Sequence, residues 1–534
     1  DFNMERFPDV TFYYTSEGKI DYKIVKNEFG KVLFKLDYEP NLKTAILKLD
    51  DDHGTEIFLD AGTTNYYSDN SVKTPITRYL LTYTDDGLVA FKEYAGFQNV
   101  PVVNEDLIHG KKYKYNEKGL VVEEEYIGID GNVRGNKAGM AVKTFEYDEN
   151  DNWISVGYLT PERAASDDGM GHCRGKFEHD EYGNRTIERY LTLDGKPSTK
   201  DKRGCAGVKF CYDERGNKIS MVYFDVDGKR FQDASGVAAN IYEYDENGFL
   251  IKHSFEDQAK NPTYSIKDGD ALGIIKYERD SVGLPKSIRY YDIQGKPAVL
   301  SDGYHGELYQ YDENGNITLC STIDTLGKLA VSDGLYAQTS CKYDDQNRRI
   351  EESYLSLDGT PSSDAYGVST IKLYYDLRGN NTKIECFGTD GKLTMNSNMF
   401  ACCAAEYDDV GNCVKIFYYD ENMKLTNSSD GIAIYVNAYD PASNLLIETK
   451  CYDKSENLVY SEHQKYDSRA NIIEYYCSDK EGELLDGTPV QRFKYDDNNR
   501  LVETSYHKLD GSLMNHPEFN YAVDKRVLDE KGNC

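Results

Sequence analysis

The sequence lacks the features that identify membrane proteins and nucleic-acid-binding proteins. No apolar run approaches the roughly 18 residues that a membrane-spanning helix needs. Basic residues are in the minority, because 62 Lys and Arg stand against 92 Asp and Glu and give a formal net charge of -30. Phosphate binding requires a basic surface. We therefore expect no nucleic-acid partner and no direct membrane insertion within this segment.

The catalytic motifs of the large enzyme classes are also missing. The sequence has no Gly-x-Ser-x-Gly, His-Glu-x-x-His, Gly-Lys-Ser/Thr phosphate loop or Gly-x-Gly-x-x-Gly fingerprint. The nine histidines do not cluster, and the segment 169–175, in which His172 precedes Cys173, is interpreted as a turn in a linker. We expect a protein that is not an enzyme, with no catalytic residues and no cofactor.

The 12 cysteines indicate neither a disulfide framework nor a zinc site. They occupy unrelated positions, such as Cys211 and the adjacent Cys402 and Cys403, and lack paired Cys-x-x-Cys spacing. We expect most of them to be small buried apolar residues. Tryptophan is nearly absent, with one residue, whereas 46 tyrosines stand against 20 phenylalanines. Tyrosine suits a sheet that is buried on one face and wet on the other.

A tandem repeat with a period near 32 residues contains these tyrosines. Its anchor is a tyrosine followed by an acidic turn, as in the Tyr-Asp-Glu-Arg-Gly-Asn segment 212–217. The anchors are Tyr83, Tyr115, Tyr147, His179, Tyr212, Tyr244, Tyr277, Tyr311, Tyr343, Tyr375, Tyr407, Tyr439, Tyr466 and Tyr495. Most neighbours are 32 to 34 residues apart, and the last two steps shrink to 27 and 29. Such a period indicates an array in which each unit completes its core against its neighbours.

Other features recur at fixed distances from the anchor. A second tyrosine follows eleven residues later, at Tyr94, Tyr126, Tyr158, Tyr190, Tyr223, Tyr354, Tyr418 and Tyr506. An Asp-Gly step and a variable linker then lead to the next anchor. Apolar residues alternate around the acidic turn, as Ile219 and Met221 do. This alternation predicts an antiparallel hairpin with one buried face, joined by a type I turn that a glycine bulge closes.

We therefore predict an all-β fold, in which tandem antiparallel β-hairpins form an elongated or spiral β-sheet, as in a solenoid or shell. The repeats cover residues 76–534, about fourteen units with the last one truncated, and residues 1–75 are predicted to form a degenerate β cap. The chain opens on Asp1 and stops at Cys534, inside what looks like another unit. We expect it to be part of a longer protein.

The tandem Tyr-Asp-x-x-Gly-Asn units, as at 311–316 and 375–380, resemble the YD repeats of bacterial Rhs and wall-associated proteins and of the teneurin shell. The resemblance covers residues 83–534. It implies a long sheet of stacked hairpins, wound as a spiral or shell, in a large surface or secreted protein with binding or encapsulating roles. The chain departs from that pattern in its longer period and in lacking an equivalent of the Rhs core that precedes a toxin.

The acidic turns also raise the question of calcium. Asp225 and Asp227 place oxygen atoms at alternate positions, as a hard cation requires. No closing bidentate glutamate follows at a fixed distance, and turn chemistry by itself demands Asp, Asn and Gly at these positions. We therefore predict no metal site.

Two hypotheses for the function follow. The first is a non-enzymatic β-repeat scaffold that presents an extended surface for binding proteins or glycans, at the cell surface or exterior of a bacterium. The alternative is a structural assembly element, such as a filament subunit or a shell that encloses cargo, in which contacts between units, including self-assembly, are the function. The repeats single out no ligand-binding residue.

Overall fold

The computed structural model describes residues 76–526 except for short gaps at 77, 97–98, 105, 137–138, 167–171, 193, 200–203, 268 and 497–499. Of residues 1–75 it describes mainly the backbone of β1 (Asp9–Tyr14), β2 (Ile20–Lys26), β3 (Val32–Glu39), β4 (Thr44–Asp50) and β5 (Glu56–Ile57). Strands β1 to β4 pair antiparallel in order, and β4 pairs with β6, so they belong to the same sheet as the repeats. The rest of the predicted cap lies outside the described residues.

The repeats form consecutive antiparallel hairpins within one sheet of 35 strands. Its further strands are β6 (Arg78–Tyr83), β7 (Val89–Ala95), β8 (Gly110–Tyr115), β9 (Val121–Ile127), β10 (Val142–Tyr147), β11 (Trp153–Leu159), β12 (Arg174–His179), β13 (Arg185–Leu191), β14 (Gly207–Tyr212), β15 (Lys218–Phe224), β16 (Ala239–Tyr244), β17 (Leu250–Glu256), β18 (Pro262–Thr263), β21 (Ile274–Arg279), β22 (Pro285–Tyr291), β23 (Gly306–Tyr311), β24 (Ile317–Ile323), β25 (Gln338–Tyr343), β26 (Arg349–Leu355), β27 (Thr370–Tyr375), β28 (Asn381–Phe387), β29 (Cys402–Tyr407), β30 (Cys413–Tyr419), β31 (Ile434–Tyr439), β32 (Leu446–Tyr452), β33 (Leu458–Tyr466), β34 (Ile472–Asp479), β35 (Val490–Tyr495), β36 (Leu501–His507) and β37 (Val523–Lys525). Strands β19 (Ser265–Lys267) and β20 (Asp270–Leu272) form a separate hairpin, and η3 (Leu485–Gly487) is a 3-10 turn. None of the described segments forms a helix long and apolar enough to cross a membrane. The predicted all-β fold of tandem antiparallel hairpins is confirmed.

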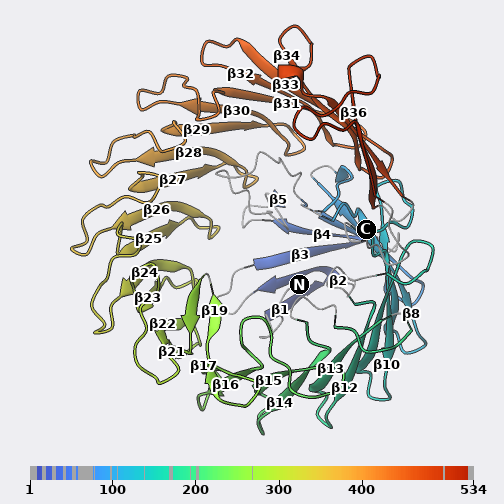
Figure 1. Cartoon of the computed structure of the whole chain (residues 1–534), viewed down its shortest axis with the longest axis vertical. Helices are drawn as coiled ribbons and strands as arrows, with labels where there is room; N and C mark the ends of the chain where they lie inside the picture. The colour runs from blue at the N-terminus through green and yellow to red at the C-terminus, as the bar shows by residue number, and fades with distance from the viewer. Residues whose placement is uncertain are drawn as a thin grey trace.

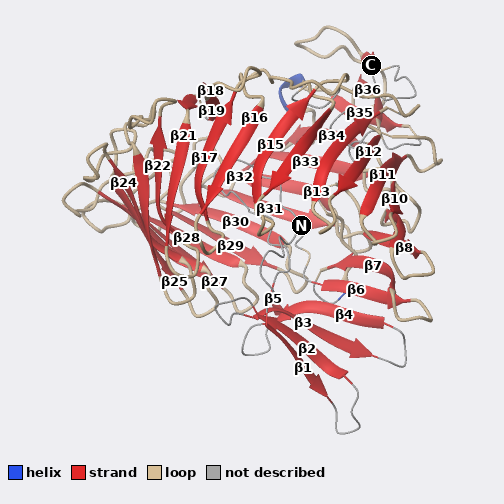
Figure 2. Ribbon diagram, turned by 90° about the horizontal axis from the view of Figure 1, so that it is seen from below, coloured by secondary structure: helices blue, strands red, loops and turns tan. Residues whose placement is uncertain are grey.

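The sheet curls into a spiral rather than extending as a rod. Figure 1 shows the strands following one another round a ring, from β8 and β10 through β22 and β28 to β36, where the chain returns to the first repeats. Figure 2 shows β1 to β4 continuing the sheet at one end of this ring. A twist of constant hand, repeated over similar hairpins, accumulates into such a curve. Of the two forms that the sequence left open, the structure has the spiral.

The hairpins share one bulge, and all of them except that of β31 and β32, whose turn is one residue longer, share one register. In the hairpin of β14 and β15, Val208 faces Tyr223, and the register shifts by one residue just before the anchor Tyr212. The same shift lies before the last residue of the first strand in every hairpin from β6–β7 to β35–β36. Gly216 has a φ of 83°, and its amide donates to the backbone oxygen of Asp213 at 3.1 Å. This is the predicted tight turn closed by a glycine bulge.

The structure corrects one anchor. The sequence pattern placed it at Tyr277, but the bulge of the hairpin of β21 and β22 lies between Glu278 and Arg279. Arg279 therefore holds the anchor position. Tyr290, eleven residues later, has the position of the second tyrosine and is 6% exposed. The interpretation of Tyr277 was wrong because it followed residue type, whereas the turn glycine, Gly283, marks the correct spacing.

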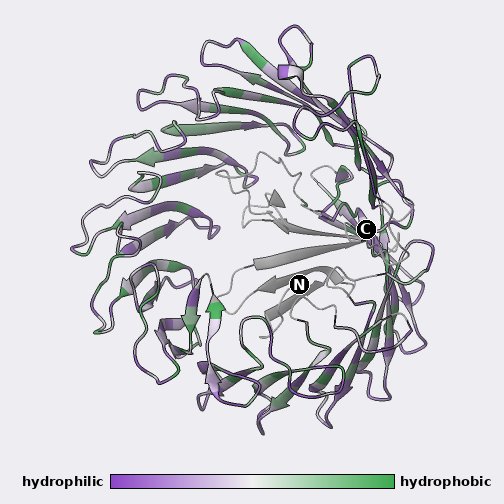
Figure 3. Ribbon diagram, in the orientation of Figure 1, coloured by the Kyte–Doolittle hydropathy of each residue, from purple (hydrophilic) through white to green (hydrophobic). Residues whose placement is uncertain are grey.

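Position eleven of each unit and the linkers together form the core. Tyr190, Tyr223, Phe255 and Tyr290 hold this position in four successive units and belong to one buried cluster, which also contains linker residues such as Val237. Further clusters that combine the same two kinds of position lie along the sheet. Figure 3 shows the complementary pattern, with hydrophilic residues concentrated in the loops. The sheet thus buries one face, as the alternation predicted.

Loops of one design recur within a unit. Asp213, Asp225 and Asp233 each accept at Oδ1 from the backbone amides two and four residues further on, at 2.8–3.0 Å. Bonds of this kind between side chain and backbone stabilise turns. Of the two aspartates that suggested calcium, Asp225 therefore holds its own loop through Oδ1, and the Asp227 carboxylate lies 3.9 Å from Lys229. Within the described ranges, no group of three or more His, Cys, Asp or Glu side chains is placed to hold a metal ion.

Candidate functional site: the contacts between units

The anchor tyrosines form hydrogen bonds to the preceding unit. The hydroxyl of Tyr407 donates to the backbone oxygen of Asn381, the first residue of β28, at 2.9 Å. Equivalent bonds of 2.6–3.1 Å join Tyr115 to Val89, Tyr147 to Val121, Tyr212 to Arg185, Tyr244 to Lys218, Tyr311 to Pro285, Tyr343 to Ile317, Tyr375 to Arg349, Tyr439 to Cys413, Tyr466 to Leu446 and Tyr495 to Ile472. At the corrected anchor, Nε of Arg279 donates to the backbone oxygen of Leu250 at 2.9 Å. The anchor thus needs a polar atom at the tip of a long side chain, which phenylalanine lacks.

His179 interrupts this series of bonds. It holds the anchor position of the hairpin of β12 and β13, and its Nδ1 is buried without a hydrogen-bond partner. The carbonyl that an anchor tyrosine would reach belongs to Trp153, the first residue of β11. Trp153 is 44% exposed, and its ring packs against Phe145 with the centroids 5.2 Å apart. This junction is therefore held without the bond from anchor to carbonyl.

The acidic turns form a polar rim along one edge of the sheet. In the turn after β14, Nδ2 of Asn217 donates to Oδ2 of Asp213 at 2.9 Å, and this bond is the main cause that lowers the pKa of Asp213. Neighbouring turns also touch. Nη1 of Arg378 donates to the backbone oxygen of Asp409 in the next turn at 2.7 Å. The turns therefore connect units as well as strands.

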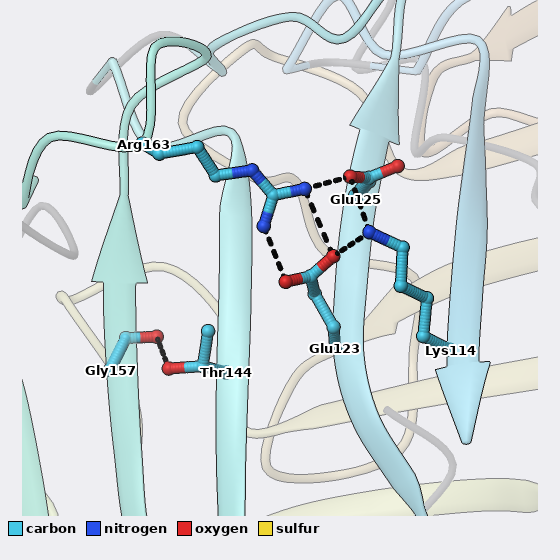
Figure 4. A network of polar contacts seen from close by, with 6 residues as sticks. All are labelled: Lys114, Glu123, Glu125, Thr144, Gly157 and Arg163. Carbon is cyan, nitrogen blue, oxygen red and sulfur yellow. Dashed lines mark hydrogen bonds and ion pairs between the residues drawn. The ribbon is translucent and has the colours of Figure 1, made fainter. Parts of the chain in front are cut away.

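Charged pairs cross the face of the sheet opposite the core. Arg163 binds Glu123 and Glu125 of the preceding unit, and Lys114 reaches the same two carboxylates at 2.5 and 3.4 Å (Figure 4). The Arg163 guanidinium is the main cause that lowers the pKa of Glu123 to about 2. Similar cross-strand pairs are Lys252 with Glu243, Lys342 with Glu351, Lys465 with Glu474 and Lys494 with Glu503, all at 2.6–2.7 Å. Charged pairs thus support much of this face, which also carries buried apolar residues next to the position-eleven side chains, such as Ile127 and Phe224.

One contact joins two units that are far apart in the sequence. Nη2 of Arg134 donates to Oδ1 of Asn471 at 2.7 Å, across a separation of 337 residues. Arg134 follows β9, and Asn471 lies in the turn between β33 and β34. The Arg134 side chain is 1% exposed, and this burial lowers its pKa to about 10. We call this pair the closing contact, because it joins the loop after β9 to the turn between β33 and β34, two units far apart along the sheet.

The closing contact was not found from the sequence. The available signal was an arginine at a linker position that holds small or apolar residues in other units. The histidine and cysteine that the sequence did single out are packed within a linker. His172 is 8% exposed and stacks on Tyr190 at 4.5 Å, and the amide of Cys173 donates to the backbone oxygen of Leu191 at 3.1 Å. Residues 167–171, which include the start of the proposed turn, lie outside the described residues.

No family model and no curated protein sequence matches the chain. Among solved structures, the crystal structure of TcdB2-TccC3 is similar with a TM-score of 0.44 and 11% identity, over 95% of this chain and 25% of that chain. The Photorhabdus luminescens Tc holotoxin pore with the TccC3-D651A mutation gives 0.41 and 13%, over 95% and 25%. A porin-like protein from Bacteroides uniformis gives 0.15 and 11%, over 54% and 88%.

The chain spans about a quarter of the length of the first two structures. Likeness at this level carries no conclusion about function. The YD-repeat resemblance stays a prediction of the sequence, and the fold rests on the hairpins themselves.

Proposed function

We propose that the chain is a structural assembly element, a wall of β-hairpins that closes on itself to form part of a shell. The closing contact carries this proposal, because it brings residues 337 positions apart to 2.7 Å. Distant parts of the sheet contact each other within one chain, so no second copy is needed to complete the curve. A filament subunit would instead leave this surface for another copy, so we favour the shell over the filament.

The bonds between units suit a wall. Anchor phenols and several of the acidic turns tie one hairpin to the next, so bending at these junctions would break polar contacts. The apolar face is covered by the linkers, and much of the opposite face is polar and paired. We also propose that the chain acts without catalysis and lies at a bacterial cell surface or exterior, as its repeats and their acidity suggest.

Small-angle X-ray scattering tests the closed form. Fourteen two-strand units in a straight sheet would make a rod of roughly 130 Å, since each strand advances about 4.7–4.9 Å. The closed wall predicts a clearly smaller maximum dimension and the scattering profile of a curved, open-centred particle. A rod-like profile would contradict the proposal.

A binding scaffold is the second candidate, and the His179 junction favours it. Trp153, the first residue of β11, is 44% exposed, and Tyr182, in the turn after β12, is 82% exposed. Exposed aromatic rings with polar neighbours are suited to protein or sugar partners. Binding of the purified chain to a glycan array should fall in Trp153→Ala, whereas Leu326→Ala, which removes an exposed side chain in another unit, should bind as the native protein does. Equal binding by both variants, or none by the native chain, would reject this candidate.

A further inference from the structure

We propose that Arg134 and the Asn471 turn form a recognition contact that determines at which unit the sheet meets itself, and so sets the circumference of the wall. This inference rests on the closed wall proposed above. It adds that the meeting point is specified by particular side chains rather than by sheet twist alone.

Arg134 lies at a position of the unit where other units carry no charged side chain. Its amide donates to the backbone oxygen of Tyr126, and the same bond identifies the equivalent residue in other units. Those residues are Val102, Ser166, Ser198, Phe231, Ala298, Ala330, Ser362, Thr394, Thr426 and Met514. All are small or apolar, so a unit folds without a charged side chain at this position. The arginine is therefore explained by the remote turn that it contacts.

The turns on either side of the Asn471 turn do not offer Arg134 the same acceptor. Asn471 takes the fifth position after its anchor, where its backbone oxygen accepts from the amide of Asp467. In the adjoining turns the same bond is made by Leu445 and by Arg500. Leucine offers no side-chain acceptor, and Oδ1 of the preceding Asn444 already accepts from Asn412 at 2.7 Å, whereas arginine would repel the guanidinium of Arg134. A shift of the sheet by one unit in either direction thus loses the contact.

The guanidinium of Arg134 is buried and depends on Asn471 for a hydrogen bond. Nε and Nη1 of Arg134 are buried without hydrogen-bond partners, so Asn471 supplies its hydrogen bond in this position. Asp467 favours the charge of Arg134, and Arg469 opposes it. A buried cation that loses its acceptor is strongly unfavourable. Gly128 leaves room for the side chain, since a Cβ there would lie 3.2 Å from Cδ of Arg134.

Arg134→Ser tests the proposal with a residue that three other units already carry at this position, at Ser166, Ser198 and Ser362. We expect amide exchange in the segments 128–134 and 467–471 to become at least about tenfold faster, because these loops lose their remote partner. The maximum dimension from scattering should increase, while exchange in β14 to β17 stays unchanged. Asn471→Ala should reproduce these effects.

Asn380→Ala is the matched control. Asn471 donates from Nδ2 to Asp467 within its own turn, and Asn380 makes the equivalent bond to Asp376 at 2.7 Å. Asn380→Ala therefore removes the same bond within a turn that is far from the closing contact. Faster exchange should then be confined to the segment 376–380, with unchanged scattering. If Arg134→Ser and Asn471→Ala also left scattering and remote exchange unchanged, the recognition contact would be refuted.

Moving the contact by one unit gives a rescue experiment. The triple variant Arg134→Ser, Ser166→Arg and Arg500→Asn places the arginine and its acceptor one unit further along both edges. We expect it to restore the closed dimension that Arg134→Ser loses, and Arg134→Ser with Ser166→Arg alone to stay open, because Arg500 faces the new arginine. Failure of the rescue would argue against specification by these side chains. A native chain that scatters as a rod would instead refute the proposed function itself.

Discussion

Replacing His179 by tyrosine should stabilise the junction between the hairpins β10–β11 and β12–β13. The phenol would fill the anchor position and donate to the backbone oxygen of Trp153, as the eleven anchor tyrosines described above donate to the equivalent carbonyls. A new hydrogen bond contributes about 0.5–1.5 kcal/mol, and removing a buried unpaired nitrogen contributes about 1–3 kcal/mol. We expect a net gain near 2 kcal/mol, or about a 30-fold slowing of local amide exchange.

Native-state hydrogen exchange is the appropriate assay, because a long array need not unfold in one step. Protection should rise in β11, β12 and β13 and not elsewhere. The reverse change, Tyr407→Phe, should lower local stability by about 1 kcal/mol, since it removes a 2.9 Å bond to Asn381. Tyr182→Phe, at an 82% exposed ring, should change nothing. Equal exchange in His179→Tyr and the native chain would refute the role assigned to the anchor.

Three further predictions concern the core, the turns and metal. Tyr223→Ala should cost on the order of 3 kcal/mol in chemical denaturation, because the ring is 6% exposed within the core cluster. Folding lowers the pKa of Asp213, chiefly through Asn217, so its stabilising effect is complete above the ordinary aspartate pKa of about 4 and is lost as the pH falls below it. In acid titrations followed by circular dichroism and chemical denaturation, the native chain should lose more stability between neutral and acidic pH than Asp213→Asn, which lacks the carboxylate and starts from a lower stability. The melting temperature should be the same in millimolar calcium as in the same concentration of magnesium. A rise of many degrees in calcium alone would show that the turns bind calcium.

The hairpin could be predicted from the sequence because its signals are local. The turn glycine, the aspartate and the alternation around Tyr212 all act within one unit, and the register of β14 and β15 follows from them. The same locality explains the error at Tyr277. The tyrosine pattern placed the anchor at Tyr277, whereas Gly283 and the buried Tyr290 mark Arg279 as the anchor.

The closing contact lies beyond such reasoning. The twist summed over the hairpins between Arg134 and Asn471 brings distant units near each other, and this sum cannot be read from any single unit. The sequence carried one indication, an arginine where Ser166 and Ser198 stand in the next units. Its partner could be identified only once the sheet had been traced round the ring.

Single-particle electron cryomicroscopy of the purified chain would show the closing contact itself. We expect one dominant class of closed particles, in which density for the loop 128–134 contacts the turn 467–471. A population of open, rod-like or variably curved particles, with these two segments apart, would contradict this expectation.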